Sequence, residues 1–270
     1  MEKLVSVNIT TFNRVNYLTR CLDSVLSQTY AHLEIVVVDD CSTDGTSKVM
    51  EHYTQLDSRI KYIRHEFNQG NAYARNTALH NCTGYYVAFM DDDDAWIDDE
   101  KISKQVQIFE DNTNPRLGII CSSVKIIDQY GKEQIKIEKH PDNLVSHILI
   151  QNGIIHNSTV LTKRSIMEDV EGFDIDMPKG IDAEFFRAVI VKHKYEVLFM
   201  PDVTTAYYIH EGVRMTTNNE KFLYKLFKVN ARVIKKYFKA FLVHPKALYF
   251  RLYIVVRSLY KFMIYYRLQK

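Results

Sequence analysis

The chain has few cysteines, and no two of them lie close together. The four are Cys21, Cys41, Cys82 and Cys121 in 270 residues, so neither a zinc knuckle nor a Cys-x-x-Cys redox motif is available. Scattered thiols of this kind are typical of proteins in a reducing compartment. We therefore expect a cytosolic protein whose cysteines carry no metal or disulfide.

Long apolar runs are also absent. No stretch approaches the roughly 18 apolar residues that span a bilayer. A secretory signal would need an apolar core near the start, and Asn8, Asn13 and Arg14 interrupt that segment. We therefore expect any contact with a membrane to be peripheral.

Acidic residues are missing from the last 50 positions. Residues 221–270 contain 13 Lys or Arg and no Asp or Glu, whereas the first 220 residues contain 22 basic and 33 acidic side chains. The net charge of +2 therefore combines a body at −11 with a tail at +13.

Short β-branched and aromatic runs alternate with helical patterns over the first 100 residues. Strands are predicted at 4–9, 33–38, 60–64 and 85–90, and helices at 15–25 and 49–56. This alternation implies right-handed crossovers and a largely parallel sheet covered on both faces. The sequence therefore predicts an α/β, nucleotide-binding fold with one main domain.

Beyond residue 100 the pattern is less regular. Helices are predicted around 102–109 and at 181–191, and strands at 118–127, 156–162, 195–200 and 203–210, the last two at the edge of the sheet.

Four consecutive aspartates, Asp91–Asp94, directly follow the fourth predicted strand. Open α/β sheets bind ligands at the carboxyl ends of their strands. Adjacent carboxylates repel one another unless a cation compensates them, and oxygen ligands suit Mg²⁺ or Mn²⁺. Acidic runs are often only solvated loops, but the position after a buried strand favours a metal site.

Asp40 and Arg75 are candidate ligand contacts that come before that strand in the sequence. Asp39 and Asp40 end the second predicted strand, where a carboxylate could bind a base or ribose, or could instead cap the next helix. Arg75 lies at a predicted helix start and could reach a diphosphate. It could equally be a surface arginine or a partner for the acidic run.

Asp182 and His210 are the remaining candidates. Asp182 lies in the first turn of a predicted helix, where it could act as a general base or merely complement the helix dipole. His210 ends the last predicted strand and could ligate a metal or contact a diphosphate, although a lone histidine more often does neither.

Five motifs in order and spacing resemble glycosyltransferase family 2, the inverting enzymes with the GT-A fold. They lie at residues 10–14, 27–30, 36–46, 70–76 and 90–96. The resemblance covers about residues 3–215. It implies a catalytic domain over 1–215, with a nucleotide-binding half at 1–100 and an acceptor-binding half at 101–215, followed by a basic, aromatic, helical region at 216–270.

The resemblance also implies roles for individual residues. Asp91 and Asp93 would ligate Mn²⁺ or Mg²⁺, and His210 is a weaker candidate for a third ligand. Asp182 would be the catalytic base. The nucleotide-sugar would be bound by Thr10, Phe12, Arg14, Asp40, Arg75 and Asp92. The family often has Glu before the base and a small residue inside Asp-x-Asp, whereas this chain has Ile181 and Asp92.

The implied activity is metal-dependent, inverting hexosyl transfer. A hexose or N-acetylhexosamine would move from a UDP-sugar to a lipid-linked glycan acceptor in bacterial surface polysaccharide or lipopolysaccharide synthesis. A nucleotidyltransferase would be expected to carry a Gly-rich loop after the first strand, and residues 10–14 contain no Gly. A catalytically inactive sugar-nucleotide module is the other alternative, against which Asp182 and the intact acidic run argue.

The C-terminal tail interleaves its cations with 13 Phe or Tyr residues. Basic amphipathic helices of this type lie on anionic membranes, so we expect residues 221–270 to hold the protein on the inner face of the cell membrane. The alternative is helical packing on the domain with a basic solvated face. Nucleic acid is not expected as a partner, because no recognition motif accompanies the charge.

Overall fold

The computed structural model describes residues 2–150, 154–210 and 220–268, and these form two compact units. Unit 1 comprises Met1–His140, Gly153–Phe173 and Tyr195–His210. Unit 2 comprises Pro141–Asn152, Asp174–Lys194 and Glu211–Lys270. Unit 2 thus combines the C-terminal helices with two segments from within residues 1–215, and the domain boundary near residue 215 stays a prediction.

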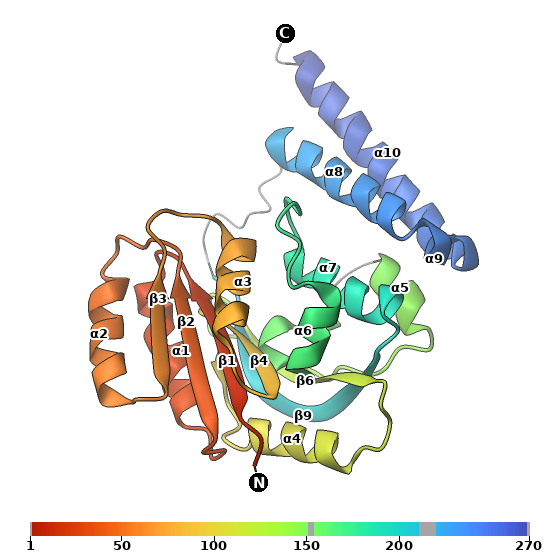
Figure 1. Ribbon diagram of the computed structural model, residues 1–270. Coiled ribbons are helices and arrows are strands. Elements are labelled where there is room, and N and C mark those ends of the chain that lie inside the picture. The colour runs from red at the N-terminus through yellow and green to blue at the C-terminus, as the bar shows by residue number, and fades with distance from the viewer. Residues whose placement is uncertain (1, 151–153, 211–219, 269–270) are drawn as a thin grey trace. The chain divides into compact units, whose positions relative to one another are not determined.

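Unit 1 is built on a sheet of nine described strands in the order β3-β2-β1-β4-β8-β6-β9-β5, with β7 beside β6. Its first four strands are parallel (Figure 1): β3 (Ile60–Arg64), β2 (Leu33–Asp39), β1 (Val5–Thr11) and β4 (Tyr86–Asp91). These are the four strands predicted for the first 100 residues. The predicted α/β fold with a sheet flanked by helices is confirmed.

The second half of the sheet mixes directions. It contains β5 (Ala95–Trp96), β6 (Leu117–Ile127), β7 (Glu133–Lys136), β8 (Leu161–Lys163) and β9 (Glu196–Tyr208). Strand β8 is antiparallel to β4 and β6, whereas β9 is parallel to β6 and antiparallel to β5.

Two predictions for this half are wrong in detail. The expected strand at 156–162 is a 3-10 turn, Asn157–Thr159, followed by β8, because the turn directs Asn157 and Ser158 to bind the acidic run. The two expected edge strands form one long strand, β9, paired on both sides. Its register with β6 is interrupted around Pro201, whose nitrogen cannot donate a ladder hydrogen bond.

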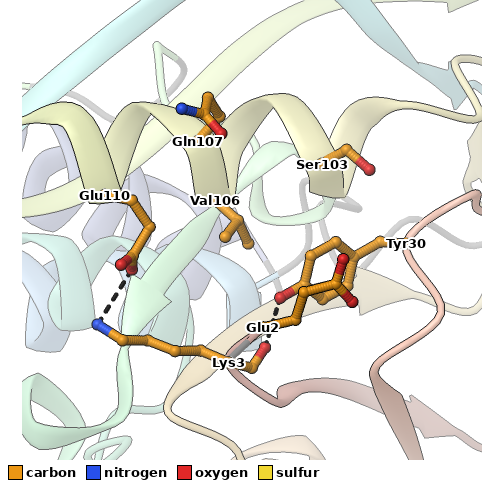
Figure 2. Close-up of a pocket in the computed structure, with 7 residues that line it drawn as sticks. All are labelled: Glu2, Lys3, Tyr30, Ser103, Val106, Gln107 and Glu110. Carbon is orange, nitrogen blue, oxygen red and sulfur yellow. Dashed lines mark hydrogen bonds and ion pairs between the residues drawn. The ribbon is translucent and has the colours of Figure 1, made fainter.

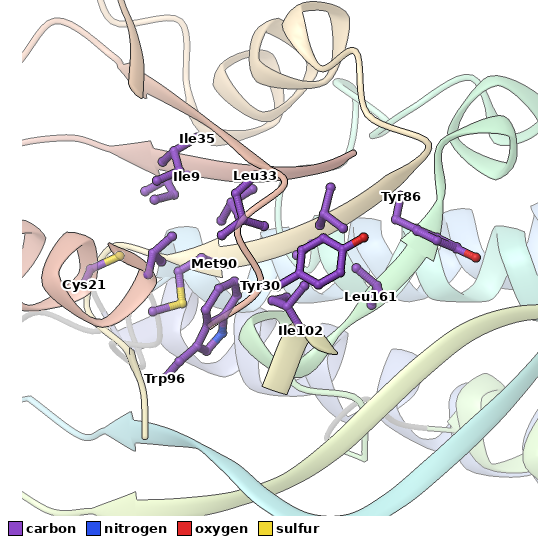
Figure 3. Packing of buried hydrophobic residues seen from close by; sticks show 14 of the residues in the cluster. Ile9, Cys21, Tyr30, Leu33, Ile35, Tyr86, Met90, Trp96, Ile102 and Leu161 are labelled. Atoms are coloured by element: carbon purple, nitrogen blue, oxygen red, sulfur yellow. The ribbon is translucent and has the colours of Figure 1, made fainter. Parts of the chain in front are cut away.

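The two faces of the parallel strands are covered by different helices. Alternate residues of β1, Val5, Val7 and Ile9, join a core (Figure 3) with α1 (Val15–Leu26), α2 (Thr46–Leu56) and α4 (Lys101–Asp111). The other face contacts α3 (Asn71–Asn81), and Asn8 of β1 donates to the carbonyl of Arg75 at 3.1 Å. The period of two residues therefore decides which helix meets which side chain. Helix α6 (Arg164–Val170) follows β8.

Unit 2 is helical. Its elements are α5 (Leu144–Ile150), α7 (Ile181–Arg187) with a π-type continuation Ala188–Lys192, α8 (Glu220–Lys236), α9 (Phe238–Val243) and α10 (Pro245–Leu268). The predicted helix at 181–191 and the predicted helical tail are confirmed. Among the helices in the described parts of the chain, none has both the length and the apolar character that a membrane span requires.

Buried polar contacts join the elements of unit 2. The Glu184 carboxylate of α7 accepts from Arg187 at 3.1 Å and from the hydroxyl of Tyr237 at 2.8 Å, and pairs with Lys236 at 2.7 Å. Arg251 of α10 donates to the carbonyl of Leu149 at 2.6 Å. The tail helices are therefore fixed to α5 and α7 by hydrogen bonds as well as by apolar contacts.

Candidate functional site

Strand register brings the predicted site residues of unit 1 to one edge of the sheet. Thr10 is level with Asp91, and Thr11 is level with Asp39. Because parallel strands end at the same edge, the loops after β1, β2 and β4 meet there. Asp40, Arg14 and the acidic run all follow those strand ends.

Burial alternates along the acidic run. Asp92 and Asp94 are buried, whereas the side chains of Asp91 and Asp93 are 29% and 22% exposed. Asp94 accepts a 2.5 Å hydrogen bond from the hydroxyl of Ser158. Asp91 and Asp93 are therefore the two carboxylates of the run that an incoming ligand would meet first.

Arginines compensate the negative charge of the run. Arg14 Nη1 lies 2.9 Å from both Asp92 Oδ1 and Asp93 Oδ2, and Arg75 Nη2 donates to Asp91 Oδ1 at 2.7 Å. Arg20, which the sequence did not single out, donates to the carbonyl of Asp93 at 2.8 Å. The run is thus an ordered part of the structure and not a solvated loop.

Burial is also the main cause of the altered acidity in the run. It raises the pKa of Asp92 to about 6 and, together with the neighbouring carboxylates, raises the pKa values of Asp93 and Asp94. Repulsion between the aspartates, expected from the sequence, acts in the same direction but is a smaller cause. A cation at this edge would offset both effects.

Asp40 is engaged by its own loop. Its carboxylate accepts from the backbone N–H groups of Gln69 and Gly70 at 2.8 and 2.7 Å, and lies 2.8 Å from His65 Nδ1. It thereby fixes the segment that begins α3 and leads to Arg75. Neither Asp39 nor Asp40 caps α2, because Asp44 binds Thr46 at the start of that helix.

His210 and two residues of the β1 loop lie around the same edge. The His210 ring packs against that of Tyr17 at a tilt of 34°, with centroids 4.2 Å apart, and its Nε2 lies 4.0 Å from Asp93 Oδ2. Phe12 is 43% exposed, and Thr10 donates to Asn71 at 3.1 Å. The structure therefore gathers these residues with Asp91–Asp93, Arg14 and Arg75 in unit 1.

A divalent cation fits the donor set at Asp93. Two ligands of one octahedral ion lie about 3 to 4 Å apart, and His210 Nε2, which has no hydrogen-bond partner among the described residues, is 4.0 Å from the Asp93 carboxylate. The described residues contain no group of three or more His, Cys, Asp or Glu side chains arranged to hold a metal. Mg²⁺ and Mn²⁺ commonly use one or two carboxylates and complete their shell with phosphate and water.

Asp182 lies in unit 2, in the first turn of α7, as predicted. Gly180 precedes the helix with φ of 70°, a left-handed conformation that glycine adopts without strain. The neighbouring Phe185 and Phe186 are buried and anchor the helix that carries the carboxylate.

The sequence missed Asn157 and Ser158. Asn157 Nδ2 donates to Asp91 at 2.9 Å, and the Ser158 hydroxyl accepts from the backbone N–H of Asp91 at 3.1 Å. The two side chains lie 66 residues or more beyond Asp91 in the sequence. No local sequence pattern could therefore predict that they bind the acidic run.

Two hollows of the described surface lie away from the acidic run. One, of about 370 Å³, is lined by Lys3, Tyr30 and Glu110 among others (Figure 2), and a second of about 550 Å³ lies beside Lys104 and Met200. Lys3 precedes β1, so the first hollow lies at the amino ends of the parallel strands, opposite to the acidic run. Neither hollow contains a predicted site residue.

Comparison with known families decides the classification. The sequence profile described as "Glycosyl transferase family 2" matches residues 6–169, which include β1, β2, β4 and the acidic run. The chain belongs to glycosyl transferase family 2. The resemblance seen in the sequence motifs is therefore confirmed.

Two relatives of this family-2 chain come from bacteria. The teichuronic acid biosynthesis glycosyltransferase TuaG of Bacillus subtilis is 36% identical over 163 residues, 60% of this chain and 63% of TuaG. WfgD of Escherichia coli, named as a UDP-Glc:α-D-GlcNAc-diphosphoundecaprenol β-1,3-glucosyltransferase, is 42% identical over 167 residues, 62% of each protein. The matched region thus spans less than two thirds of either relative.

Solved structures share the fold of this family-2 chain. Staphylococcus aureus TarS 1–349 in complex with UDP-GlcNAc gives a TM-score of 0.68 at 23% identity, covering 86% of this chain and 66% of that chain. The mannosyltransferase PcManGT of Pyrobaculum calidifontis, in complex with GDP-Man and Mn²⁺, gives 0.63 at 20% identity, covering 96% and 76%.

Proposed function

We propose that this protein is a metal-dependent, inverting glycosyltransferase that moves a hexose or N-acetylhexosamine from a UDP-sugar to a glycan acceptor. The observation that carries the proposal is the pair of accessible carboxylates, Asp91 and Asp93, at the carboxyl edge of parallel strands with two arginines beside them. Family membership supports the activity, and the names of WfgD and TarS support a UDP-sugar donor.

The metal proposed for this site is Mn²⁺ or Mg²⁺, held by Asp91 and Asp93 with His210 as a further ligand. When bound, it would neutralise charge on the diphosphate of the donor. Arg14 donates to the Asp93 carboxylate, and its guanidinium would contact the phosphates of the donor beside it. The Mn²⁺ complex of PcManGT supports this choice of ion.

The nucleotide-sugar is proposed to lie along the same edge. Thr10 and the exposed ring of Phe12 would meet the uridine, and Arg75 would meet the diphosphate. Asp40 would act by holding the loop that leads to α3, and Asp92 would act through its hydrogen bond to Arg14. All of these side chains belong to unit 1.

The proposed chemistry is a single displacement at the anomeric carbon. Asp182 would take the proton of the acceptor hydroxyl while that oxygen attacks from the face opposite to the leaving UDP. Arg14 and Arg75 would stabilise the negative charge that develops on the departing diphosphate. Attack from the opposite face inverts the configuration, so an α-linked donor gives a β-linked product.

Replacing Asp182 by Asn tests the proposed base. Asp182→Asn keeps the shape of the side chain but cannot accept a proton, so kcat should fall by about 10²- to 10⁴-fold while UDP binding stays unchanged. Asp176→Asn, on the exposed loop before α7, is the matched control. Full transfer by Asp182→Asn with intact donor binding would exclude this base.

The acceptor is proposed to be lipid-linked and to belong to bacterial surface polysaccharide or lipopolysaccharide synthesis. The name of WfgD specifies a diphosphoundecaprenol acceptor, and that of TuaG specifies teichuronic acid. Apolar side chains on one face of α10 are exposed at helical spacing: Tyr249, Tyr253, Val256, Tyr260 and Met263. This face, in a tail rich in cations, supports a peripheral site on an anionic membrane.

A panel of nucleotide sugars tests the function as a whole. UDP-glucose, UDP-galactose, UDP-N-acetylglucosamine and GDP-mannose are each incubated with the full chain and Mn²⁺, and release of the nucleoside diphosphate is measured. Slow, metal-dependent release from one UDP-sugar is expected. Release of pyrophosphate from a nucleoside triphosphate and a sugar phosphate would favour a nucleotidyltransferase, and binding without any turnover would favour an inactive module.

A further inference from the structure

A second cluster of polar side chains lies in unit 1 next to Asp91. It contains Glu138, just after β7, His156 and Asn157 at the 3-10 turn, and Tyr207 on β9. None of these residues was expected from the sequence to act in the site. Asn157 links the cluster to the acidic run, because its Nδ2 donates to Asp91 at 2.9 Å.

His156 is the centre of this cluster. Its Nε2 lies 3.3 Å from Glu138 Oε1, and its ring centroid lies 5.4 Å from that of Tyr207. Glu138 also pairs with Lys136. Burial, followed by the charge of Lys136, lowers the pKa of His156, so the neutral imidazole presents one donor and one acceptor near pH 7.

One buried polar atom of the cluster has unused hydrogen-bonding capacity. Asn157 is 7% exposed and its Oδ1 has no hydrogen-bond partner among the described residues, whereas His156 Nε2 faces Glu138. A buried polar atom without a partner costs about 1 to 3 kcal/mol of stability. A buried acceptor that is kept without a partner beside Asp91 fits a ligand whose hydroxyl group supplies the missing bond.

The side chains of the cluster indicate which class of ligand it would bind. A carboxylate, an imidazole and an amide offer hydrogen bonds in several directions, and Tyr207, 37% exposed, offers the apolar ring face on which a pyranose can stack. A phosphate would be repelled by the Glu138 carboxylate. A neutral sugar ring therefore fits these groups better than the nucleotide does.

We propose that Glu138, His156, Asn157 and Tyr207 form a saccharide subsite that binds a hexopyranose ring beside Asp91. The subsite rests on the proposed function, because its sugar is either that of the UDP-sugar donor or that of the acceptor. Asn157 joins the subsite to the diphosphate end of the site by its hydrogen bond to Asp91.

Calorimetric titration of UDP and UDP-glucose, each with Mn²⁺, tests the donor arm. Wild type is compared with Glu138→Gln and Tyr207→Ala, and Glu133→Gln, an exposed Glu on β7 paired with Lys125, is the matched control. If the donor sugar occupies the subsite, both variants bind UDP-glucose about tenfold more weakly and bind UDP as the wild type does, since a hydrogen bond to the charged Glu138 and stacking on the Tyr207 ring are each worth about that factor.

The acceptor arm uses a short-chain lipid diphosphate that carries N-acetylglucosamine. If the acceptor sugar occupies the subsite, UDP-glucose binding is unchanged in the variants and the KM for this lipid rises about tenfold. Equal weakening of UDP and UDP-glucose together with a lower Tm would mean that the cluster only supports the fold, and unchanged values in both arms would also overturn the subsite. Failure of the wild type to bind either nucleotide would overturn the proposed function itself.

Discussion

Individual residues of the acidic run differ in burial although their chemistry is the same. Asp92 and Asp94 face the interior, and Asp91 and Asp93 face the edge where a ligand would lie. The sequence predicted the site because four carboxylates after a strand are a strong local pattern. The local pattern alone could not say which of the four are buried, since their burial depends on Arg14 and Ser158, which come from distant segments; the different roles of Asp91, Asp92 and Asp93 came only from the family resemblance.

Lys101 gives the sharpest pH prediction at this scale. The side chain is fully buried over the ring of Trp96, and burial lowers the pKa of its ammonium from 10.5 to about 7. Between pH 7 and 10.5 the unfolded chain therefore holds a proton that the folded chain has released. The contribution of Lys101 to the free energy of unfolding therefore increases as pH rises from 7 to 10.5. Below pH 7 the folded protein carries the full destabilisation of a buried ammonium.

Lys101→Met should remove this dependence. In urea unfolding between pH 7 and 10, the wild type should gain stability relative to Lys101→Met by up to about 1.4 kcal/mol per pH unit. Lys48→Met, at an exposed position of α2, should keep the wild-type slope. Parallel pH profiles for wild type and Lys101→Met would contradict the assigned shift.

Secondary structure elements were predicted best where one pattern extends over several residues. The strands β1 to β4 and the helix α1 follow from their apolar periodicity, and Leu18, Leu22 and Val25 are buried as expected. The turn at Asn157–Thr159 and the continuous strand β9 were missed. The turn forms where Asn157 and Ser158 bind the acidic run. Strand β9 is continuous because it pairs with β6 on both sides of Pro201.

Tyr237 fixes α7 to the tail at the scale of elements. Its buried hydroxyl donates to Glu184 at 2.8 Å, within the same network as Arg187 and Lys236. Tyr237→Phe leaves the charged carboxylate with one donor fewer, so the free energy of unfolding should fall by about 1.5 to 3 kcal/mol. Urea unfolding measures this, with Tyr249→Phe, 75% exposed on α10, as the control. Equal stabilities of the two variants would show that the bond contributes nothing net.

For the whole molecule, charge and exposure separate the tail from the body. The sequence left two alternatives for residues 221–270, membrane contact and packing on the domain, and the tail helices have a packed face as well as an exposed one. Ala247, Arg251 and Ser258 of α10 are buried, whereas Tyr249, Tyr253 and Tyr260 are exposed. Periodicity alone could not assign these faces, because apolar residues occur on both.

Co-sedimentation with vesicles tests the membrane proposal on the full chain. Binding to vesicles with phosphatidylglycerol should exceed binding to pure phosphatidylcholine and should weaken as salt rises. Replacing Tyr249, Tyr253 and Tyr260 by Ser should reduce it several-fold, and Tyr130→Ser, 82% exposed in unit 1, should not. Binding that depends neither on lipid charge nor on these substitutions would contradict the proposal.

The central claim is that Asp93 holds a divalent cation for a UDP-sugar. Its most direct test is UDP-sugar turnover as a function of Mn²⁺ concentration for wild type, Asp93→Ala and the exposed control Asp111→Ala. We predict Mn²⁺-dependent turnover in the wild type and the control, and a loss of about 10²-fold or more in Asp93→Ala, the order expected when a charge that stabilises the transition state is removed. Wild-type turnover and Mn²⁺ dependence in Asp93→Ala would contradict the account.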